Sequence, residues 1–484
     1  MAALGNSALP TTPDPMAVRD RRSMASLLRR PVALFVLLST LFGVPAIFLN
    51  PPLRGADEPA HFLRIYGISR GQLIPALTDE KGRRGLFLPP GLNEDYQFFE
   101  AMRYRFGTKG FNYRDVFAEF FRRKRDADPA TPPVFVLYAG SEAYSPAAYL
   151  SYMPAMMLAR ALDLDFLPML WLLRLVGFAA MTAVAAYAIA VVPSLKWTFL
   201  FIAMLPIALY QRTFVSPDGA ALSLAMVVTA LCLRAATAQG GGGTGQRSLW
   251  MTLGVLVKPS QAPFVLLEGI TRPLKDLPAY WRTAVVIVAP GLALTFLWLF
   301  LTSADMGAWR MVEGTGAPPE QFRLGWKLAF LVRHPDHFLA ATLGSLAKGC
   351  DLWREAIGEL GWRDIHLALP VYLLLTALFL ATCLVQIELA PATRARIAGV
   401  AGLTVLGYWV AIFLIFYLAW TPVDAPWVHG VQGRYFTIVL PPAALVIAAA
   451  MNRAPPQWIT AMLAVSGAIV SGAAMLDAIV RSQW

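Results

Sequence analysis

The residues best suited to chemistry lie in the segment GADEPAHFLRIYGISRG, residues 55–71, directly after the first long apolar run. If a helix begins at Asp57, then Asp57, His61 and Arg64 recur at i, i+4 and i+7 and share one face. A carboxylate, an imidazole and a cation around one reacting centre can move a proton and stabilise an anion. Asp57, Glu58 and His61 are therefore candidate catalytic residues, and Arg64 is a candidate substrate contact.

The same segment also has a purely structural explanation. Asp57 followed by Pro59 is a common helix start, in which the carboxylate only caps the first turn. Capping does not explain why Glu58, His61 and Arg64 accompany Asp57 beside an apolar run, where polar groups are costly unless they are used. Both interpretations stay open.

Two further polar positions interrupt apolar sequence. In SPDGAALSLA, residues 216–225, Ser216 and Pro217 form a good helix start with Asp218 in its first turn, so capping is the favoured interpretation of this substrate-binding candidate. In VLVKPSQAPF, residues 255–264, Lys258 stands in the middle of an apolar segment, where a lysine is usually paired or lines a ligand path. We expect Lys258 to contact an anion, and a snorkelling lysine is the structural alternative.

The segment WVHGVQGRYF, residues 427–436, places Arg434 and Tyr435 at the mouth of an apolar helix. Arginine beside backbone donors at a helix start suits a phosphate, and an interfacial anchor is the equal alternative. Residues 354–370, which include Glu355, Trp362 and Arg363, predict an amphipathic surface helix with an aromatic belt.

The composition defines the elements that must position these residues. The chain has 484 residues, of which 57% are hydrophobic and only 15% charged, and this is typical of an all-α polytopic membrane protein. Apolar runs long enough to cross about 30 Å of hydrocarbon occur near 31–50, 167–193, 197–214, 217–236, 283–303, 367–387, 397–420, 434–451 and 457–480.

The net charge of +11 does not indicate nucleic acid, because the basic residues are spread among helix ends and one long loop. Membrane topology and contacts with membrane lipids explain it better. The basic tail, residues 1–30, precedes a retained first helix and predicts a cytoplasmic N-terminus.

Two shorter apolar segments are assigned by the distribution of positive charge. Basic loops stay on the cytoplasmic side if 146–162 is a peripheral helix and 249–270 enters and leaves on one side. Residues 249–270 are then two half-length helices that meet near Lys258, which is tolerated where a broken helix lines a polar cavity.

This topology defines a domain over residues 31–484 whose polar segments lie on one face. The first outer loop, residues 51–145, is too long for a connector and predicts an ordered functional segment with juxtamembrane helices. A second large outer loop spans residues 304–366.

Other chemistry lacks its sequence signals. The chain has no Walker loop, no dinucleotide-binding GxGxxG in a strand and helix setting, no HExxH and no GxSxG. The three cysteines, Cys232, Cys350 and Cys383, are far apart and indicate neither a disulfide framework nor a cysteine metal site.

The order and spacing of several motifs form one pattern: DEPAHFLRIYGISRGQLIP, YSPAAYLSYMPAMMLARAL followed by Arg174, SPDGAALSLA, VKPSQAP, IGELGWRD and VQGRYF. This pattern resembles a family of bacterial integral membrane proteins catalogued as domain of unknown function 2142. Its layout is similar to that of GT-C glycosyltransferases, which take sugar from a polyprenyl-phosphate donor at the outer face of the cytoplasmic membrane.

The resemblance implies a GT-C-like bundle of about ten to twelve transmembrane helices. In GT-C enzymes an essential acidic residue lies near the start of the first outer loop, where this chain has Asp57. The resemblance makes Arg174, Lys258 and Arg434 candidates for holding the donor phosphate. It also allows a divalent ion, Mg²⁺ or Mn²⁺, with Asp57, Glu58 and His61 as the ligands.

The sequence therefore predicts an inverting glycosyltransferase of the bacterial inner membrane, with its active site facing outward. It would transfer sugar from a polyprenyl-phosphate-linked donor to a glycan or lipid acceptor, and Asp57 would be the general base. The alternative is a transporter or flippase of a lipid-linked saccharide that uses the same cavity without making bonds. A non-catalytic assembly subunit has the least support.

Overall fold

The computed structural model describes residues 30–103, 112–123, 131–138, 140–237, 243–271, 277–302 and 308–484. Helices dominate these residues, and two short strands, β1 (Gly85–Leu88) and β2 (Val134–Leu137), pair antiparallel with Gly85 opposite Leu137. The prediction of an all-α polytopic membrane protein is confirmed. Nearly all of the basic tail, residues 1–29, lies outside the described residues.

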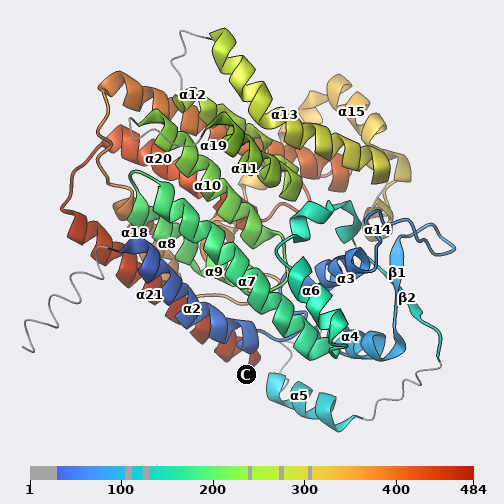
Figure 1. Cartoon of the computed structure of the whole chain (residues 1–484). Helices are drawn as coiled ribbons and strands as arrows, with labels where there is room; N and C mark the ends of the chain where they lie inside the picture. The colour runs from blue at the N-terminus through green and yellow to red at the C-terminus, as the bar shows by residue number, and fades with distance from the viewer. Residues whose placement is uncertain are drawn as a thin grey trace, which may run out of the picture.

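Seven helices in the described part of the chain are long and apolar enough to cross a membrane. In Figure 1, α2 runs beside α7 and α21, and it packs against both. The seven spans are α2 (Pro31–Leu49), α7 (Phe166–Val191), α10 (Asp218–Ala236), α13 (Leu277–Thr302), α19 (Pro391–Trp420), the combined segment Gly433–Met451 and α21 (Gln457–Gln483). Within Gly433–Met451, the 3₁₀ helix η5 (Gly433–Val439) leads into α20 (Leu440–Met451).

The seven spans are fewer than the expected ten to twelve. Two of the nine apolar runs are not single long helices, and the two shorter segments, 146–162 and 249–270, form no long helix either. The run 197–214 breaks before Pro206 into α8 (Lys196–Met204) and α9 (Pro206–Thr213). Proline has no N–H for the preceding turn and starts a new helix there. The run 367–387 contains only α18 (Leu369–Thr382), whose 14 residues span about 21 Å. Residues 146–162 form only the short helices η2 (Pro146–Tyr149) and α6 (Met153–Ala161), in agreement with a peripheral segment.

The segment around Lys258 folds as a helical hairpin, as its sequence predicts. Helix α11 (Thr244–Val257) ends at Lys258, and the 3₁₀ helix η3 (Pro259–Leu267) and α12 (Glu268–Thr271) follow. The chain then returns along α11, because Arg247 Nε near its start lies 2.7 Å from Glu268 Oε1. At the other end, Lys258 Nζ lies 2.5 Å from Asp218 Oδ1 at the start of α10. The start of α11 and the start of α12 therefore lie side by side, and Lys258 forms the tip of the hairpin at the opposite end.

The first long loop is ordered where the structure describes it. It contains α3 (Glu58–Ser69), β1, α4 (Pro90–Arg103), α5 (Tyr113–Arg122), β2 and the 3₁₀ helix η1 (Ser141–Ala143). Aromatic residues from this loop pack on α7 in one core, as Phe62 and Phe99 do on Phe166 at centroid distances of 5.2 and 5.7 Å. This packing fixes α3, which carries the acidic segment, against the helix bundle (Figure 1).

The second long loop is also helical in its described part. It contains α14 (Ala308–Thr315), η4 (Pro319–Phe322), α15 (Leu324–Arg333), α16 (Pro335–Leu346) and α17 (Gly349–Ile357). Helix α17 packs against η5 and α9. The residues that follow α17 therefore lie over the starts of η5 and α3.

Candidate functional site

A small cleft lies where the starts of α3 and η5 meet α9 and the end of α17. Its volume is about 40 Å³. We call it the Asp57 cleft, since Asp57 lies on its wall with a side chain that is 47% exposed. Its lining residues are Ala56, Asp57, Ile207, Tyr210, Gln211, Phe214, Glu355, Glu359, Gly361, Trp362, Arg363, Gln432 and Arg434.

Asp57 occupies the position before α3, but its side chain does not cap the helix. Its backbone is left-handed, with φ of 59°, and its carboxylate makes no capping hydrogen bond. Arg434 Nη2 instead donates to Asp57 Oδ2 at 2.7 Å. A left-handed non-glycine residue is uncommon and concentrates at functional sites. The capping interpretation of Asp57 is therefore wrong in this structure.

Arg434 also shapes the proton affinity of Asp57. Burial raises the pKa of this carboxyl group, but the charge and hydrogen bond of Arg434, together with the influence of His61, more than offset it, and the net pKa lies below the usual 3.8. A nearby cation favours the ionised form of a carboxyl group. Asp57 is therefore a carboxylate at neutral pH.

A second carboxylate stands behind Arg434. Asp218 Oδ1 lies 2.5 Å from Lys258 Nζ, and Asp218 Oδ2 lies 3.7 Å from Arg434 Nε. The side chains of Asp218 and Lys258 are only 7% and 9% exposed. Ser216 Oγ accepts the N–H of Asp218 at 3.1 Å. Ser216 thus stands at the helix start with Asp218 in the first turn, as the sequence predicts, and Asp218 also links the hairpin tip to Arg434.

Arg434 keeps hydrogen-bond donors that no described residue uses. Its side chain is 8% exposed, yet neither Nε nor Nη1 has a hydrogen-bond acceptor among the described residues. Buried donors are nearly always paired in folded proteins, and an unmade bond costs about 1–3 kcal/mol. The aromatic ring of Tyr435 lies 4.5 Å from Lys258 Nζ and 5.2 Å from the Arg434 guanidinium. The guanidinium in the cleft wall therefore keeps hydrogen-bonding capacity beyond its contacts with the described residues.

His61 lies behind the cleft wall and is neutral. Its Nδ1 lies 2.9 Å from the hydroxyl oxygen of Tyr149, and its ring contacts the edge of Tyr144. Burial lowers the pKa of His61 to about 4, although the negative charges of Asp57 and Asp218 oppose the shift. A neutral imidazole in this place can orient neighbouring groups, and it carries no charge at neutral pH.

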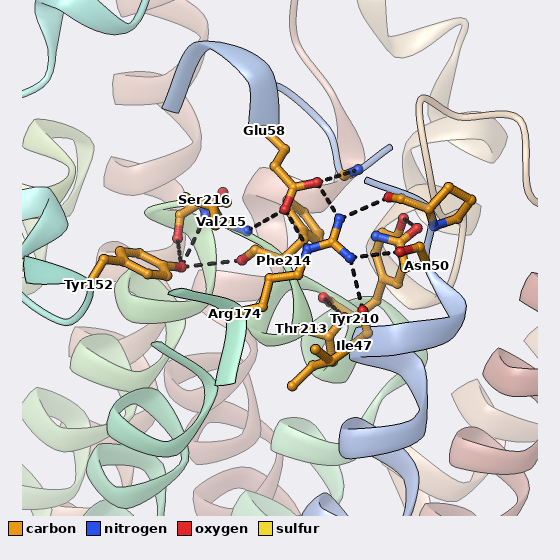
Figure 2. A network of polar contacts seen from close by, with 12 residues as sticks. Ile47, Asn50, Glu58, Tyr152, Arg174, Tyr210, Thr213, Phe214, Val215 and Ser216 are labelled. Carbon is orange, nitrogen blue, oxygen red and sulfur yellow. Dashed lines mark hydrogen bonds and ion pairs between the residues drawn. The ribbon is translucent and has the colours of Figure 1, made fainter. Parts of the chain in front are cut away.

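Arg174, predicted to hold phosphate, lies in a buried network of polar contacts (Figure 2). Arg174 Nη2 lies 2.6 Å from Glu58 Oε2, and both side chains are 0% exposed. Arg174 also donates to the carbonyl oxygens of Ile47 and Asn50 at 2.9 and 2.6 Å and to that of Pro51 at 2.9 Å. The guanidinium thereby provides donors for carbonyl groups at the end of α2 and just after it, where the helix leaves carbonyls without partners.

The carboxylate of Glu58 is equally occupied. Its oxygens accept the backbone N–H groups of Gly55 and Val215 at 3.2 and 3.0 Å, in addition to two bonds from Arg174. Neither Glu58 nor Arg174 lines the cleft. The contacts that the structure shows for these two side chains are structural: they join α2, α3, α7 and the turn before α10.

The same network fixes that turn. Tyr152 donates its hydroxyl to the carbonyl oxygen of Ser216 at 2.8 Å and accepts the Ser216 N–H at 3.0 Å (Figure 2). The position of Asp218, two residues later, follows from these contacts.

Arg64, the remaining predicted substrate contact on α3, also has a structural role. It is fully buried, and it donates to the carbonyl oxygens of Gln72 and Leu73 at 2.8 and 2.6 Å. Its guanidinium lies 5.7 Å from the ring of Tyr138. Arg64 therefore holds the segment after α3, and it does not line the cleft.

The proposed metal ligands do not fit a metal ion. No group of three His, Cys, Asp or Glu side chains among the described residues converges as a metal site would require. Within the trio Asp57, Glu58 and His61, the oxygens of Glu58 are bound by Arg174 and backbone donors. We derive no step through a metal.

Several residues of the cleft were not recognised from the sequence as site residues. Glu355 accepts the N–H of Gly433, and Arg363 Nη2 lies 2.5 Å from Glu355 Oε1. Burial raises the pKa of Glu355, and the Gly433 N–H and Arg363 oppose this shift. Trp362 and Gln211 also line the cleft. The acidic and aromatic character of residues 355–363 was visible but resembled an ordinary surface helix, and Gln211 gave no signal at all.

The model of a family described as predicted membrane protein (DUF2142) matches residues 40–446. The chain belongs to this family. Every residue that lines the Asp57 cleft lies within the family match. The chain has no significant match among curated proteins or solved structures.

Proposed function

We propose that this member of the DUF2142 family is a membrane glycosyltransferase of GT-C type. It would transfer sugar from a polyprenyl-phosphate donor to a cell-envelope glycan or lipid. The observation that carries the proposal is the buried guanidinium of Arg434 beside the partly exposed carboxylate of Asp57: its Nη1 has no hydrogen-bond acceptor among the described residues, and its Nε has only an ion-pair contact with Asp218 at 3.7 Å. Enzymes that expel a phosphate need such a cation, and activation of a hydroxyl group needs such a base.

The chemistry balances without a further reactant. The acceptor hydroxyl oxygen attacks the anomeric carbon of the sugar from the side opposite the phosphate. The bond from this carbon to the phosphate oxygen breaks, and polyprenyl phosphate leaves with the electron pair. Asp57 takes the proton of the hydroxyl group, and Arg434 stabilises the phosphate.

In the unliganded protein, Asp57 and Arg434 neutralise each other at 2.7 Å. Since a phosphate attracts the guanidinium strongly, donor binding would draw Arg434 away from Asp57. The pKa of Asp57 would then rise, and the carboxylate would become a better base when the donor is present. Lys258 acts one step back, because it neutralises Asp218 and allows Arg434 to turn to the ligand.

The location in the membrane is part of the proposal. The basic tail before α2 suits a cytoplasmic N-terminus in a bacterial inner membrane, and the Asp57 cleft after α2 would then face the outside. Polyprenyl donors and membrane lipids would reach the cleft from the bilayer.

One observation favours a second function, a transporter or flippase of lipid-linked saccharide. The hairpin of α11 and η3 is interrupted at Lys258, and α8 and α9 are separated before Pro206. Interrupted helices that carry charged groups at their breaks are common at transporter binding sites.

One experiment compares wild type with Asp57→Asn in lipid nanodiscs, with polyprenyl phosphate esters of several sugars as donors and short glycans as acceptors. We expect transfer by wild type and a loss of about 10²–10⁴-fold in kcat for Asp57→Asn, the usual range for a general base. Asp115→Asn on the exposed face of α5 is the matched control and should keep full activity. Equal rates for Asp57→Asn and wild type would refute the assignment of the base. Movement of the donor across liposomes without product would favour the flippase.

A further inference from the structure

Gln211 carries a buried side-chain amide. It lies on α9, its residue is 1% exposed, and it lines the Asp57 cleft. Neither its Oε1 nor its Nε2 has a hydrogen-bond partner among the described residues. A carboxamide offers two donors and accepts at its oxygen, and buried amides are rarely left unpaired.

Helix α9, which carries Gln211, is anchored by contacts near it. Tyr210 donates its hydroxyl to Asn50 Oδ1 at 2.9 Å, and just after the helix the carbonyl oxygen of Phe214 accepts from Tyr152 at 3.2 Å. The position of α9 at the cleft is therefore fixed. Because the helix is already in place, binding a ligand there carries no entropic cost for ordering it.

The size of the cleft limits what Gln211 can meet. A water-sized group needs about 10–15 Å³, so the cleft volume of about 40 Å³ admits about three such groups. A whole sugar ring does not fit this deep part, but the hydroxyl groups along one ring edge do. At the rim, the indole of Trp362 is 38% exposed and offers an apolar face for the rest of a ring.

We infer that Gln211 and Trp362 form the sugar subsite of the Asp57 cleft. The Gln211 amide binds two neighbouring hydroxyl groups of a pyranose, one as donor and one as acceptor, and the ring lies against Trp362. This inference rests on the proposed function, since it names the part of the donor that the cleft recognises beside the phosphate contact at Arg434. Ordered water would satisfy the amide in the absence of sugar.

The test measures the binding of polyprenyl phosphate and of its glucose, mannose and galactose esters to the full chain in nanodiscs. Wild type should bind at least one ester about tenfold to a hundredfold more tightly than the bare lipid, as one or two hydrogen bonds allow. Gln211→Met, which keeps the side-chain size, should remove this preference and leave the affinity for the bare lipid unchanged. Gln261→Met is the matched buried control, because Gln261 Nε2 donates to the Ala221 carbonyl oxygen at 3.0 Å. It should lower the melting temperature and keep the preference.

Trp362→Ala provides a second variant at an exposed position, and it should weaken the same preference. A full preference for the sugar ester in both Gln211→Met and Trp362→Ala would overturn the subsite. If wild type transfers sugar while both variants keep the preference, only the subsite fails. If the variants lose the preference but wild type transfers nothing, the subsite stands and the transferase fails. If wild type shows no preference for any ester and no transfer, both fail.

Discussion

At the scale of single residues, the site is two ion pairs that share one arginine. Asp57 and Asp218 both face Arg434, and Lys258 neutralises Asp218 from the far side. The proton affinity of Asp57 therefore depends on where the Arg434 guanidinium lies. In the proposed mechanism, this dependence distinguishes Asp57 from Glu58, whose carboxylate is held by two bonds from Arg174.

The pH dependence of transfer should reveal this coupling. In the free protein, Arg434 holds the pKa of Asp57 below 3.8, so the acidic limb of kcat/KM should lie below that pH. A bound phosphate takes Arg434 away, so the pKa of Asp57 rises, and the acidic limb of kcat should lie at higher pH. The measurement is the initial rate of transfer against pH at low and at saturating donor. Coinciding limbs would contradict the coupling.

The sequence identified part of this site and misassigned another part. Asp57, Lys258 and Arg434 stood out because charged groups at apolar segments are costly, and Asp57 and Arg434 do meet in the structure. Glu58 and Arg174 stood out for the same reason, but they stabilise each other in the core. Residue type and spacing alone do not distinguish a structural ion pair in the core from an ion pair in a cleft. In both pairs, Glu58 with Arg174 and Asp57 with Arg434, the two residues lie more than a hundred positions apart in the sequence.

At the scale of elements, the hairpin of α11 and η3 brings Lys258 to the site. Its break was predictable, since a lysine and a proline interrupt an apolar run. The break before Pro206 also has a proline but no charged residue beside it. The apolar run 197–214 therefore predicts a single span, whereas the structure has two short helices. That second break creates α9, which supplies Gln211 to the cleft.

Removal of the Lys258 charge alone should destabilise the fold more than removal of both charges of the Lys258–Asp218 ion pair. Lys258→Met removes the nearer cation of the buried Asp218 and leaves the longer contact with Arg434 Nε at 3.7 Å, so the free energy of unfolding should fall, by at most about 3–5 kcal/mol. Adding Asp218→Asn should recover most of the loss. Denaturant unfolding in detergent measures both variants. Equal destabilisation by Lys258→Met alone and by the double variant would mean that the pair does not hold the hairpin tip.

At the scale of the whole molecule, the helices bring residues from four distant segments to one end of the bundle. Segments 56–57, 207–214, 355–363 and 432–434 all contribute residues to the cleft. The sequence predicts an ordered first loop, and its described residues do form helices and strands, but the sequence does not predict that the end of α17 reaches the site. Such long-range packing has no local sequence signal.

The arrangement of the hairpin predicts which residues share a membrane face. In a Cys350→Ser background, Gly245→Cys and Thr271→Cys should react with an impermeant maleimide from the same side of sealed vesicles. The exposed native Cys350, tested in the unmodified chain, should react from the opposite side, where the Asp57 cleft lies. The buried Cys232 and Cys383 should stay unlabelled in both cases. Labelling of positions 245 and 271 from opposite sides would show that the segment crosses the membrane.

The most direct test of the phosphate site is the affinity of the purified chain in nanodiscs for bare polyprenyl phosphate. Arg434→Gln should weaken binding about tenfold to a hundredfold, the range expected for a lost charged hydrogen bond. Arg122→Gln on the exposed face of α5 is the matched control and should bind as wild type does. Asp57→Asn should bind at least as tightly as wild type, because it frees Arg434. An Arg434→Gln variant that is folded and binds polyprenyl phosphate with wild-type affinity would contradict the proposed function.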